Sequence, residues 1–166
     1  MGRFKFIKVM AVVAMLFLLG ACQGRAMEIG TEALDFSVND TDYKMICLAD
    51  YKGKVIILNF FATWCPPCRA EIPDFIDMET EYGPKGVSFI GVSTEGVGLL
   101  REFAARLGIN YPLLSDTSRK AFTRYGPIRG VPTTYIIDKD FKIARVYIGA
   151  RPRSVVERDI KELLGQ

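Results

Sequence analysis

The amino-acid sequence predicts an α/β protein with a mixed central sheet flanked by helices, an N-terminal β-hairpin and a central αβ insertion. Two observations indicate this fold class. Through the middle of the chain, apolar runs of strand length alternate with stretches of helical periodicity, an order that is typical of α/β domains. Closer to the C-terminus, two strand-like runs are separated only by a tight turn, which makes them an antiparallel pair. The 166 residues are enough for one such domain and too few for two.

The first elements of the domain are a hairpin, a buried strand and a long helix. Residues 36–48 read as the hairpin, because a polar turn cluster interrupts a strand-like pattern there. Val55–Phe61 is an apolar run interrupted only by Asn59, as expected for a central strand covered on both faces. A helix is expected from Pro66 to Tyr82, since proline is tolerated in a first helical turn and a Gly-Pro pair ends the pattern. Pro73 lies inside this helix and is expected to kink it.

The next stretch supplies a second buried strand and the inserted αβ elements. Val87–Ser93 is strand-like, and Val97–Leu107 has a helical pattern that ends at a glycine. Tyr111–Leu114 is expected to be a short extended segment. Asp116–Tyr125 is expected to be a short helix with its first residue as the N-cap.

The chain ends with a hairpin and an amphipathic helix. Thr133–Asp138 and Lys142–Gly149 are strand-like and lie on either side of a tight turn. Apolar residues then recur at helical spacing over Arg153–Leu164.

The first 22 residues are typical of an export signal. A basic start precedes the apolar stretch Val9–Leu19, which is shorter than the roughly 20 residues of a membrane span. The following LGAC looks like a bacterial lipobox, in which Cys22 becomes the lipidated first residue of the mature chain. We therefore expect a signal peptide over residues 1–21, a tether over 22–32 and the domain over 33–166. The alternative is an uncleaved anchor helix, and either interpretation places the domain outside the cytoplasm on a membrane, on the periplasmic side in a Gram-negative bacterium.

The composition excludes several function classes. The chain has 22 basic and 19 acidic residues, and three of the basic ones lie in the expected signal, so the mature chain is balanced at 19 (22 − 3) against 19. This balance gives no basic patch for nucleic acid. The absence of histidine removes the usual general base and the commonest metal ligand.

Two cysteines at the start of the long helix are the strongest sign of chemistry. Cys65 and Cys68 flank a proline pair, and a helix N-terminus favours a thiolate because its N–H groups are unpaired and its dipole is positive there. Cys65 is therefore the expected nucleophile and Cys68 the buried resolving thiol. The prolines stiffen the loop between them.

Other interpretations of these cysteines remain open from the spacing alone. A metal site would need four ligands and has at most Cys65, Cys68 and Cys47, so we expect no metal. A static structural disulfide suits an oxidising compartment but stabilises little when it closes so small a ring. Cys47 has no expected partner, and we interpret it as a small buried apolar residue, with a regulatory thiol as the alternative.

Two separated motifs carry a resemblance to a known family. The stretch FFATWCPPC at residues 60–68 and the later GVPTT at residues 130–134 resemble the TlpA/ResA/CcmG branch of the thioredoxin superfamily. Residues 48–60 are also similar to that branch. The resemblance covers roughly residues 36–165 and implies a thioredoxin-like fold.

The resemblance also implies a function. It favours a thiol-disulfide oxidoreductase that reduces disulfides of selected proteins, such as apocytochrome c, with a membrane electron donor of the CcdA/DsbD type and no cofactor besides the Cys65–Cys68 disulfide. We expect a monomer. A metallochaperone or a thiol sensor on the same fold is the alternative class, and a disulfide oxidant is the alternative direction, because the sequence does not fix the reduction potential.

Further site residues follow from the same resemblance. Pro132 is implied to be a cis proline beside the disulfide, and the backbone of Val131 to pair with an extended substrate segment. Trp64 is implied to form an apolar lid beside the nucleophile. Pro66, Pro67 and Thr133 complete the substrate contacts that we expect.

Two carboxylates are candidates for proton transfer. Asn59 stands where thioredoxin has a buried aspartate, and an amide cannot take the proton of Cys68. Glu71 lies one helical turn after Cys68, and ResA-like proteins resemble this chain in having a glutamate there. We expect Glu71 to line the site, with a solvated surface position as the alternative. Glu95 is a weaker candidate that we expect on the surface.

Overall fold

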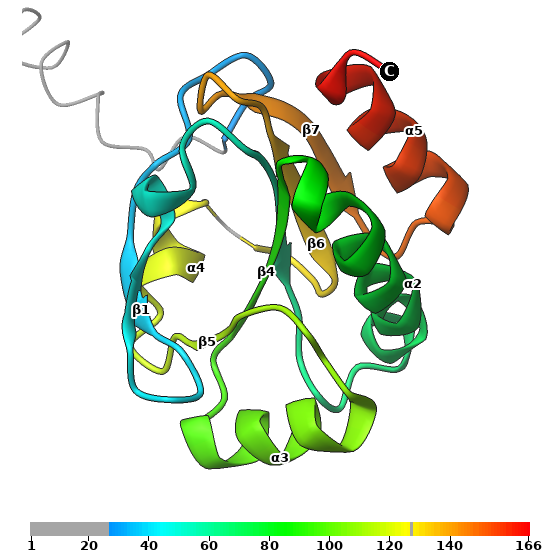
Figure 1. Cartoon of the computed structure of the whole chain (residues 1–166). Coiled ribbons are helices and arrows are strands. Elements are labelled where there is room, and N and C mark those ends of the chain that lie inside the picture. The colour runs from blue at the N-terminus through cyan, green and yellow to red at the C-terminus, as the bar shows by residue number, and fades with distance from the viewer. Residues whose placement is uncertain (1–26, 127) are drawn as a thin grey trace, which may run out of the picture.

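The structure is a computed structural model, and it describes residues 27–126 and 128–166. A five-stranded mixed sheet lies at its centre, in the order β5-β4-β3-β6-β7 (Figure 1). Its strands are β3 Val55–Phe60, β4 Val87–Ser93, β5 Leu113–Ser115, β6 Thr133–Ile137 and β7 Ile143–Ile148. Strands β3, β4 and β5 are parallel, whereas β6 is antiparallel to β3 and β7 is antiparallel to β6. The predicted mixed α/β fold is confirmed.

The N-terminal hairpin forms a separate two-stranded sheet. It consists of β1, Ser37–Asn39, and β2, Met45–Cys47, paired antiparallel. A single bridge between Asp40 and Leu114 joins the hairpin to the edge strand β5. The predicted hairpin is therefore confirmed, and it lies beside the main sheet instead of extending it by full pairing.

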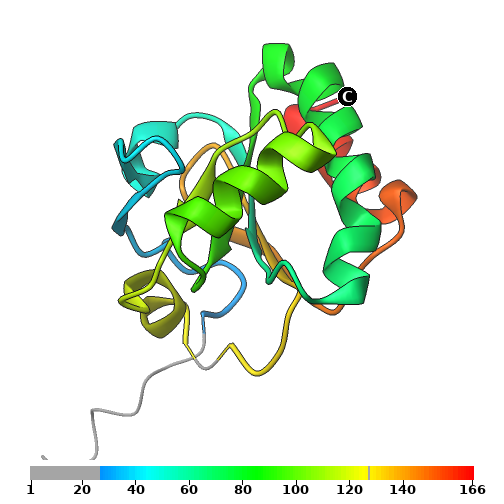
Figure 2. The same cartoon turned by 90° about the horizontal axis from the view of Figure 1, so that it is seen from below.

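Helices cover both faces of the main sheet. They are α2 Pro66–Tyr82, α3 Val97–Leu107, α4 Lys120–Arg124 and α5 Arg153–Leu164. Figures 1 and 2 show α2 and α5 together on one side of the sheet, with α4 and the hairpin on the other side. Apolar residues of α3 pack in the same cluster as those of α2 and α5.

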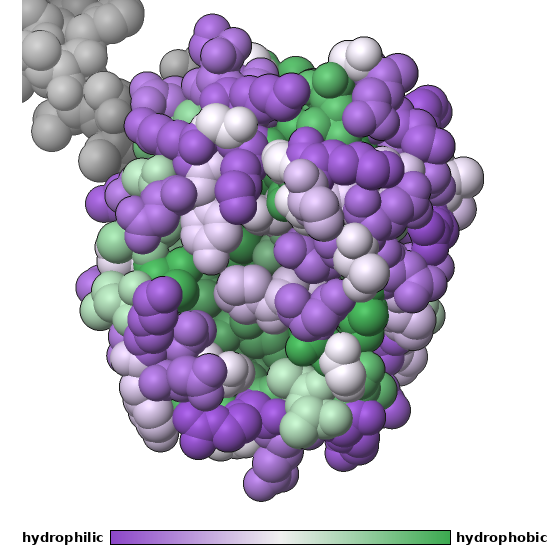
Figure 3. All heavy atoms as spheres, in the orientation of Figure 1, coloured by the Kyte–Doolittle hydropathy of each residue, from purple (hydrophilic) through white to green (hydrophobic). Residues whose placement is uncertain are grey.

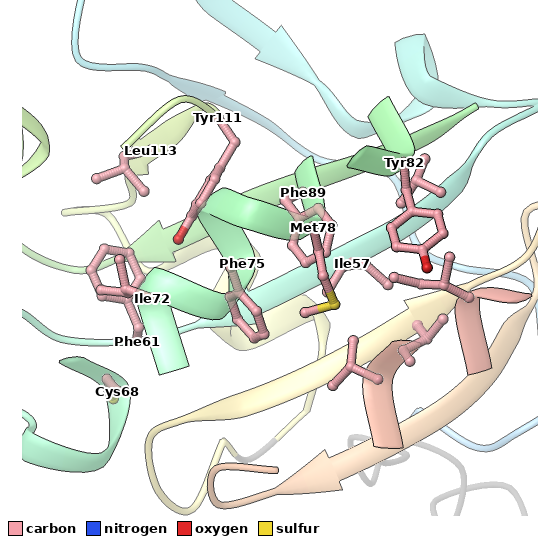
Figure 4. Packing of buried hydrophobic residues seen from close by; sticks show 14 of the residues in the cluster. Ile57, Phe61, Cys68, Ile72, Phe75, Met78, Tyr82, Phe89, Tyr111 and Leu113 are labelled. Carbon is pink, nitrogen blue, oxygen red and sulfur yellow. The ribbon is translucent and has the colours of Figure 1, made fainter. Parts of the chain in front are cut away.

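The alternation of side chains along β3 divides the core between the two faces. Val55 and Ile57 face the α2 side, where Figure 4 shows a row of apolar α2 side chains running from Cys68 toward Tyr82. The other face is rich in aromatic residues, and the Phe60 ring lies within 4.9–5.9 Å of the rings of three others, which are Phe122, Tyr125 and Tyr135. The central strand is buried on both faces because both layers pack against it.

The short helix α4 differs from its prediction. It begins at Lys120, four residues later than expected, because Arg119 has a left-handed backbone (φ 58°) that cannot continue a helix backward. Asp116 is therefore not the N-cap residue. Its buried carboxylate still accepts hydrogen bonds from the backbone N–H groups of Lys120 and Phe122. Asp116 therefore pairs the free N–H groups of the first turn of α4, although it lies four residues before the helix begins.

The antiparallel direction of β6 decides which loops meet. Phe60, the last residue of β3, pairs with Thr133, the first residue of β6. The loop that follows β3 and the loop that precedes β6 therefore emerge at the same edge of the sheet.

The outer surface is mainly polar. Hydrophilic residues cover most of the face seen in Figure 3, and apolar residues appear in the gaps between them. Within residues 27–126 and 128–166, no helix combines the length and the apolar character needed to cross a membrane. The predicted signal peptide and Cys22 lie outside the described residues.

Candidate active site

Cys65 and Cys68 form a disulfide at the N-terminus of α2. Cys65 is the N-cap residue, its N–H donates to the carbonyl of Ala62 (3.2 Å), and its sulfur accepts from the N–H of Cys68 (3.3 Å). The first two helical positions are Pro66 and Pro67, which have no N–H to leave unpaired. The local sequence thus places the first sulfur at the positive end of the helix.

The two cysteines are covered to different degrees by their surroundings. Cys68 is completely buried in the apolar cluster beside Phe61 and Ile72, and Cys65 is 3% exposed in this disulfide form. The neighbouring Trp64 is 71% exposed, and the two prolines are exposed as well. A partner that approaches the disulfide would meet the indole and the prolines first.

The loop before β6 lies against the disulfide. The Val131–Pro132 peptide bond is cis, and the carbonyl oxygen of Val131 lies 3.5 Å from the sulfur of Cys65. Val131 is half-buried. Thr133 is buried and is paired within the sheet to both Phe60 and Ile148, and its contact with a substrate stays a prediction.

Glu71 is buried next to Asn59. Its side chain is 5% exposed, and its Oε1 accepts a hydrogen bond of 2.9 Å from the amide of Asn59. The same amide donates to the hydroxyl of Thr134 (2.9 Å), and the backbone N–H of Arg151 donates to the Glu71 carboxylate. The alternative of a solvated Glu71 is therefore wrong. Sequence reasoning did not find Thr134 or Arg151, because both come from elements far along the chain.

Burial gives Glu71 an unusual proton affinity. Loss of hydration raises the pKa of Glu71 to about 7, and the hydrogen bonds from Asn59 and Arg151 only partly oppose this rise. A carboxyl with a pKa near neutrality exchanges a proton readily at physiological pH. Glu71 lies one helical turn after Cys68, so the arrangement can serve proton exchange with the thiol of Cys68 when the disulfide is open.

Glu95 is not the surface residue that we expected. It is half-buried after the end of β4, and its carboxylate accepts three hydrogen bonds. Two come from Thr63, through its N–H (2.8 Å) and its hydroxyl (2.6 Å), and one comes from the hydroxyl of Ser93 (2.9 Å). The expectation fails because β3 and β4 are parallel, so the segments that follow them leave the sheet at the same edge.

Cys47 is half-buried, so it is more exposed than the small buried apolar residue that we expected. Ile46 is the inward residue of β2, and alternation along the strand turns Cys47 away from the core. Its sulfur is 3.0 Å from the hydroxyl of Ser37 on the paired strand, and it forms no disulfide.

Within the described part of the chain, no three Cys, Asp or Glu side chains are grouped in a way that could hold a metal ion.

Comparisons with known proteins agree with this arrangement. The family model of the AhpC/TSA family matches residues 29–146. The thiol-disulfide oxidoreductase ResA of Bacillus thuringiensis (strain Al Hakam) is 35% identical over 138 residues, which cover 82% of this chain and 79% of that protein.

Solved structures show the same fold. A putative thiol:disulfide interchange protein DsbE from Chlorobium tepidum superimposes with a TM-score of 0.79 at 29% identity, over 84% of this chain and all of that one. The pneumococcal exposed lipoprotein thioredoxin from Streptococcus pneumoniae strain TIGR4 gives a TM-score of 0.69 at 31% identity, over 78% of this chain and all of that one.

Proposed function

We propose that this chain, which belongs to the AhpC/TSA family and is a thioredoxin-like thiol-disulfide oxidoreductase similar to ResA, reduces disulfides of selected proteins on the outer side of a membrane. The observation that carries the proposal is the position of the Cys65–Cys68 disulfide, at the N-terminus of α2 and against the carbonyl of Val131. A static structural bond would need neither the helix end nor an exposed apolar residue beside it.

The reaction starts from the dithiol form. The thiolate of Cys65 attacks one sulfur of the client disulfide, forms a mixed disulfide and releases the first client thiolate. Cys68 then loses its proton and attacks the sulfur of Cys65, which releases the second client thiolate and leaves the Cys65–Cys68 disulfide. Two electrons pass from the enzyme to the client, and the client thiolates take protons from water.

Glu71 is the proposed acceptor for the proton of Cys68. The two residues are one helical turn apart and both are buried, so bulk water does not reach the resolving thiol directly. Asn59 cannot take the proton, but its amide holds the carboxylate of Glu71 in place. The pKa of Glu71, raised by burial to about 7, suits a group that must take up and give back a proton in each cycle.

Client recognition is proposed at the exposed rim of the site. The backbone of Val131, before the cis Pro132, would pair with an extended client segment, and the exposed faces of Trp64, Pro66 and Pro67 would contact apolar client side chains. Apocytochrome c is the client that the resemblance to the TlpA/ResA/CcmG branch favours.

The proposed location rests on the N-terminal sequence. The LGAC stretch makes Cys22 the proposed lipidation site, with residues 1–21 as the signal, 22–32 as the tether and 33–166 as the domain. The similar pneumococcal protein is an exposed lipoprotein by its own description. A membrane protein of the CcdA/DsbD type is the proposed donor that returns two electrons to the disulfide.

Reduction of insulin disulfides with dithiothreitol as the electron source tests the activity. We expect Cys65→Ser to abolish catalysed turnover, while Cys47→Ser, the same chemical change at a thiol outside the site, leaves it unchanged. Undiminished turnover in Cys65→Ser would sink the proposal.

A second experiment tests the client and the direction of electron flow. In cells, Cys68→Ser should accumulate a mixed disulfide through Cys65, and we expect the captured proteins to be extracytoplasmic and to carry paired cysteines. Clients that are fully reduced in wild-type cells and oxidised in cells without this protein support a reductant. The opposite pattern would identify an oxidant.

A further inference from the structure

The carboxylate of Glu95 holds one residue of the active-site loop at two points. Thr63 donates both its backbone N–H (2.8 Å) and its hydroxyl (2.6 Å) to this carboxylate. Hydrogen bonds to a carboxylate are among the strong ones in proteins. Thr63 is only half-buried, so packing alone does not fix its position. Its two hydrogen bonds to Glu95, which is 32 residues later in the chain, therefore determine where this part of the loop lies.

Thr63 is a corner of the turn that delivers the nucleophile. The N–H of Cys65 donates to the carbonyl of Ala62 (3.2 Å), which closes a four-residue turn with Thr63 and Trp64 in its middle. A shift of Thr63 therefore moves Trp64 and Cys65 together.

Glu95 is itself fixed to the sheet. Its carboxylate accepts from the hydroxyl of Ser93 (2.9 Å) at the end of β4, and its carbonyl accepts from the hydroxyl of Ser115 (2.7 Å) at the end of β5. The two hydrogen bonds from Thr63 to Glu95, which we call the clamp, thus connect the active-site turn to two strands that carry no redox residue.

We propose that Glu95 is a positioning residue, which acts through Thr63 to keep the sulfur of Cys65 at the N-terminus of α2 when the disulfide is open. The inference rests on the proposed function, because it matters only if Cys65 works as a thiolate. In the oxidised form the bond to Cys68 already restrains the sulfur. In the reduced form that restraint is gone, and the clamp then holds Thr63, inside the turn, to the end of β4, beyond the backbone hydrogen bond from Phe61 to Val92 that precedes the turn.

Positioning and simple charge predict opposite results when Glu95 is changed. A nearby negative charge disfavours a thiolate, so losing that charge alone would lower the pKa of Cys65. Losing the clamp lets the sulfur leave the helix end, where the N–H groups and the dipole stabilise the thiolate, so the pKa of Cys65 would rise.

The test measures alkylation of Cys65 by iodoacetamide in the reduced full chain at pH 5 to 9, with mass spectrometry to assign the label. We expect Glu95→Gln to raise the apparent pKa of Cys65 and to slow its alkylation about fivefold at pH 7. Glu95→Asp keeps the charge but is one methylene too short to reach both donors, and we expect it to behave like Glu95→Gln. Thr63→Val removes one donor without any change of charge and should give a smaller effect. Thr63→Ser keeps the hydroxyl and should behave like wild type.

The matched control is Glu102→Gln, the same change at an exposed position of α3, and it should leave the alkylation profile of Cys65 unchanged. An unchanged or lowered pKa in Glu95→Gln, or a wild-type profile in Glu95→Asp, overturns the positioning role while the proposed function stands. A wild-type Cys65 that titrates like an ordinary free thiol overturns the nucleophile assignment and the clamp together.

Discussion

Glu71 and Glu95 approach the Cys65–Cys68 loop from two elements, the helix that begins there and the turn after strand β4. Glu71 is enclosed by the apolar layer between α2 and the sheet and accepts from one side-chain amide and one backbone N–H. Glu95 lies at the edge of the sheet and accepts from two hydroxyls and one backbone N–H. A glutamate side chain thus has two uses in this site. Burial gives Glu71 a pKa near neutrality, whereas the hydrogen bonds that Glu95 accepts make it a clamp.

The difference shows that the surroundings of a carboxylate decide its chemistry. Burial removes water from the carboxyl of Glu71 and raises its pKa more than its two hydrogen bonds lower it, so this carboxyl is suited to carry a proton. Several donors spread over two segments of chain make Glu95 a connection between those segments. Three variants test the Glu71 side of this contrast, beginning with the largest expected effect.

Asn59→Asp should destabilise the protein, because it removes the amide that donates a hydrogen bond to the buried carboxylate of Glu71. The amide that donates to Oε1 of Glu71 at 2.9 Å becomes a second carboxyl in a buried position. At pH 8 two negative charges would face each other there, and we expect the free energy of unfolding to fall by about 4 kcal/mol. At pH 5 the pair can share a proton, so the loss should be smaller.

Urea unfolding of the oxidised protein at both pH values measures this effect. Asn110→Asp makes the same change at an exposed asparagine and should cost less than about 1 kcal/mol at either pH. An equal loss at pH 5 and pH 8 in Asn59→Asp would show that repulsion with Glu71 is not the cause.

Glu71→Gln should remove a pH dependence of stability. The pKa of Glu71 is about 7 in the folded protein against 4.5 ordinarily, so the folded state holds this proton more tightly than the unfolded chain. Stability from this group is complete below about pH 4.5 and decreases as the pH rises to about 7, by about 3 kcal/mol in total. The difference in unfolding free energy between wild type and Glu71→Gln, followed from pH 4 to pH 8, should trace this decrease. Glu102→Gln serves as the exposed control, and a flat difference would contradict the buried carboxyl.

Thr134→Val should have the smallest effect, because it removes only the second acceptor of the Asn59 amide. One buried N–H is left without a partner, and we expect a loss of about 1 kcal/mol that Thr134→Ser restores. Combining Thr134→Val with Glu71→Gln tests whether the three side chains form one network. A coupling energy above about 0.5 kcal/mol supports the network, and strict additivity would argue against it.

The sequence predicts the elements whose ends carry a local signal. Pro66–Tyr82, Val97–Leu107 and Arg153–Leu164 begin and end at the predicted residues, because proline pairs and glycines mark or border their ends. The short α4 is the exception, since its start depends on the left-handed backbone of Arg119, and an arginine residue gives no sequence signal of that conformation.

The site residues also divide into those that a local sequence motif predicts and those that only the pairing of distant strands brings together. The positions of Cys65 and Cys68 at a helix start follow from a motif of a few residues, and the cis bond at Pro132 was implied by the resemblance that the separate GVPTT motif carries. The clamp at Glu95 follows from neither motif, because it depends on the parallel register that pairs Phe60 with Val92 and so brings the ends of two strands to one edge. Recognising β3 and β4 as parallel neighbours, and then asking which polar residues follow each, would have pointed to Thr63 and Glu95.

The position of β6 late in the chain also sets an order of events during biosynthesis. Cys65 and its contact Val131 are 66 residues apart in the chain, so both thiols are made well before the segment that will cover one of them. A nascent chain therefore exposes two unshielded cysteines until the hairpin β6–β7 has emerged and inserted beside β3. Selective reactivity is thus a property of the completed domain, acquired only with its C-terminal third.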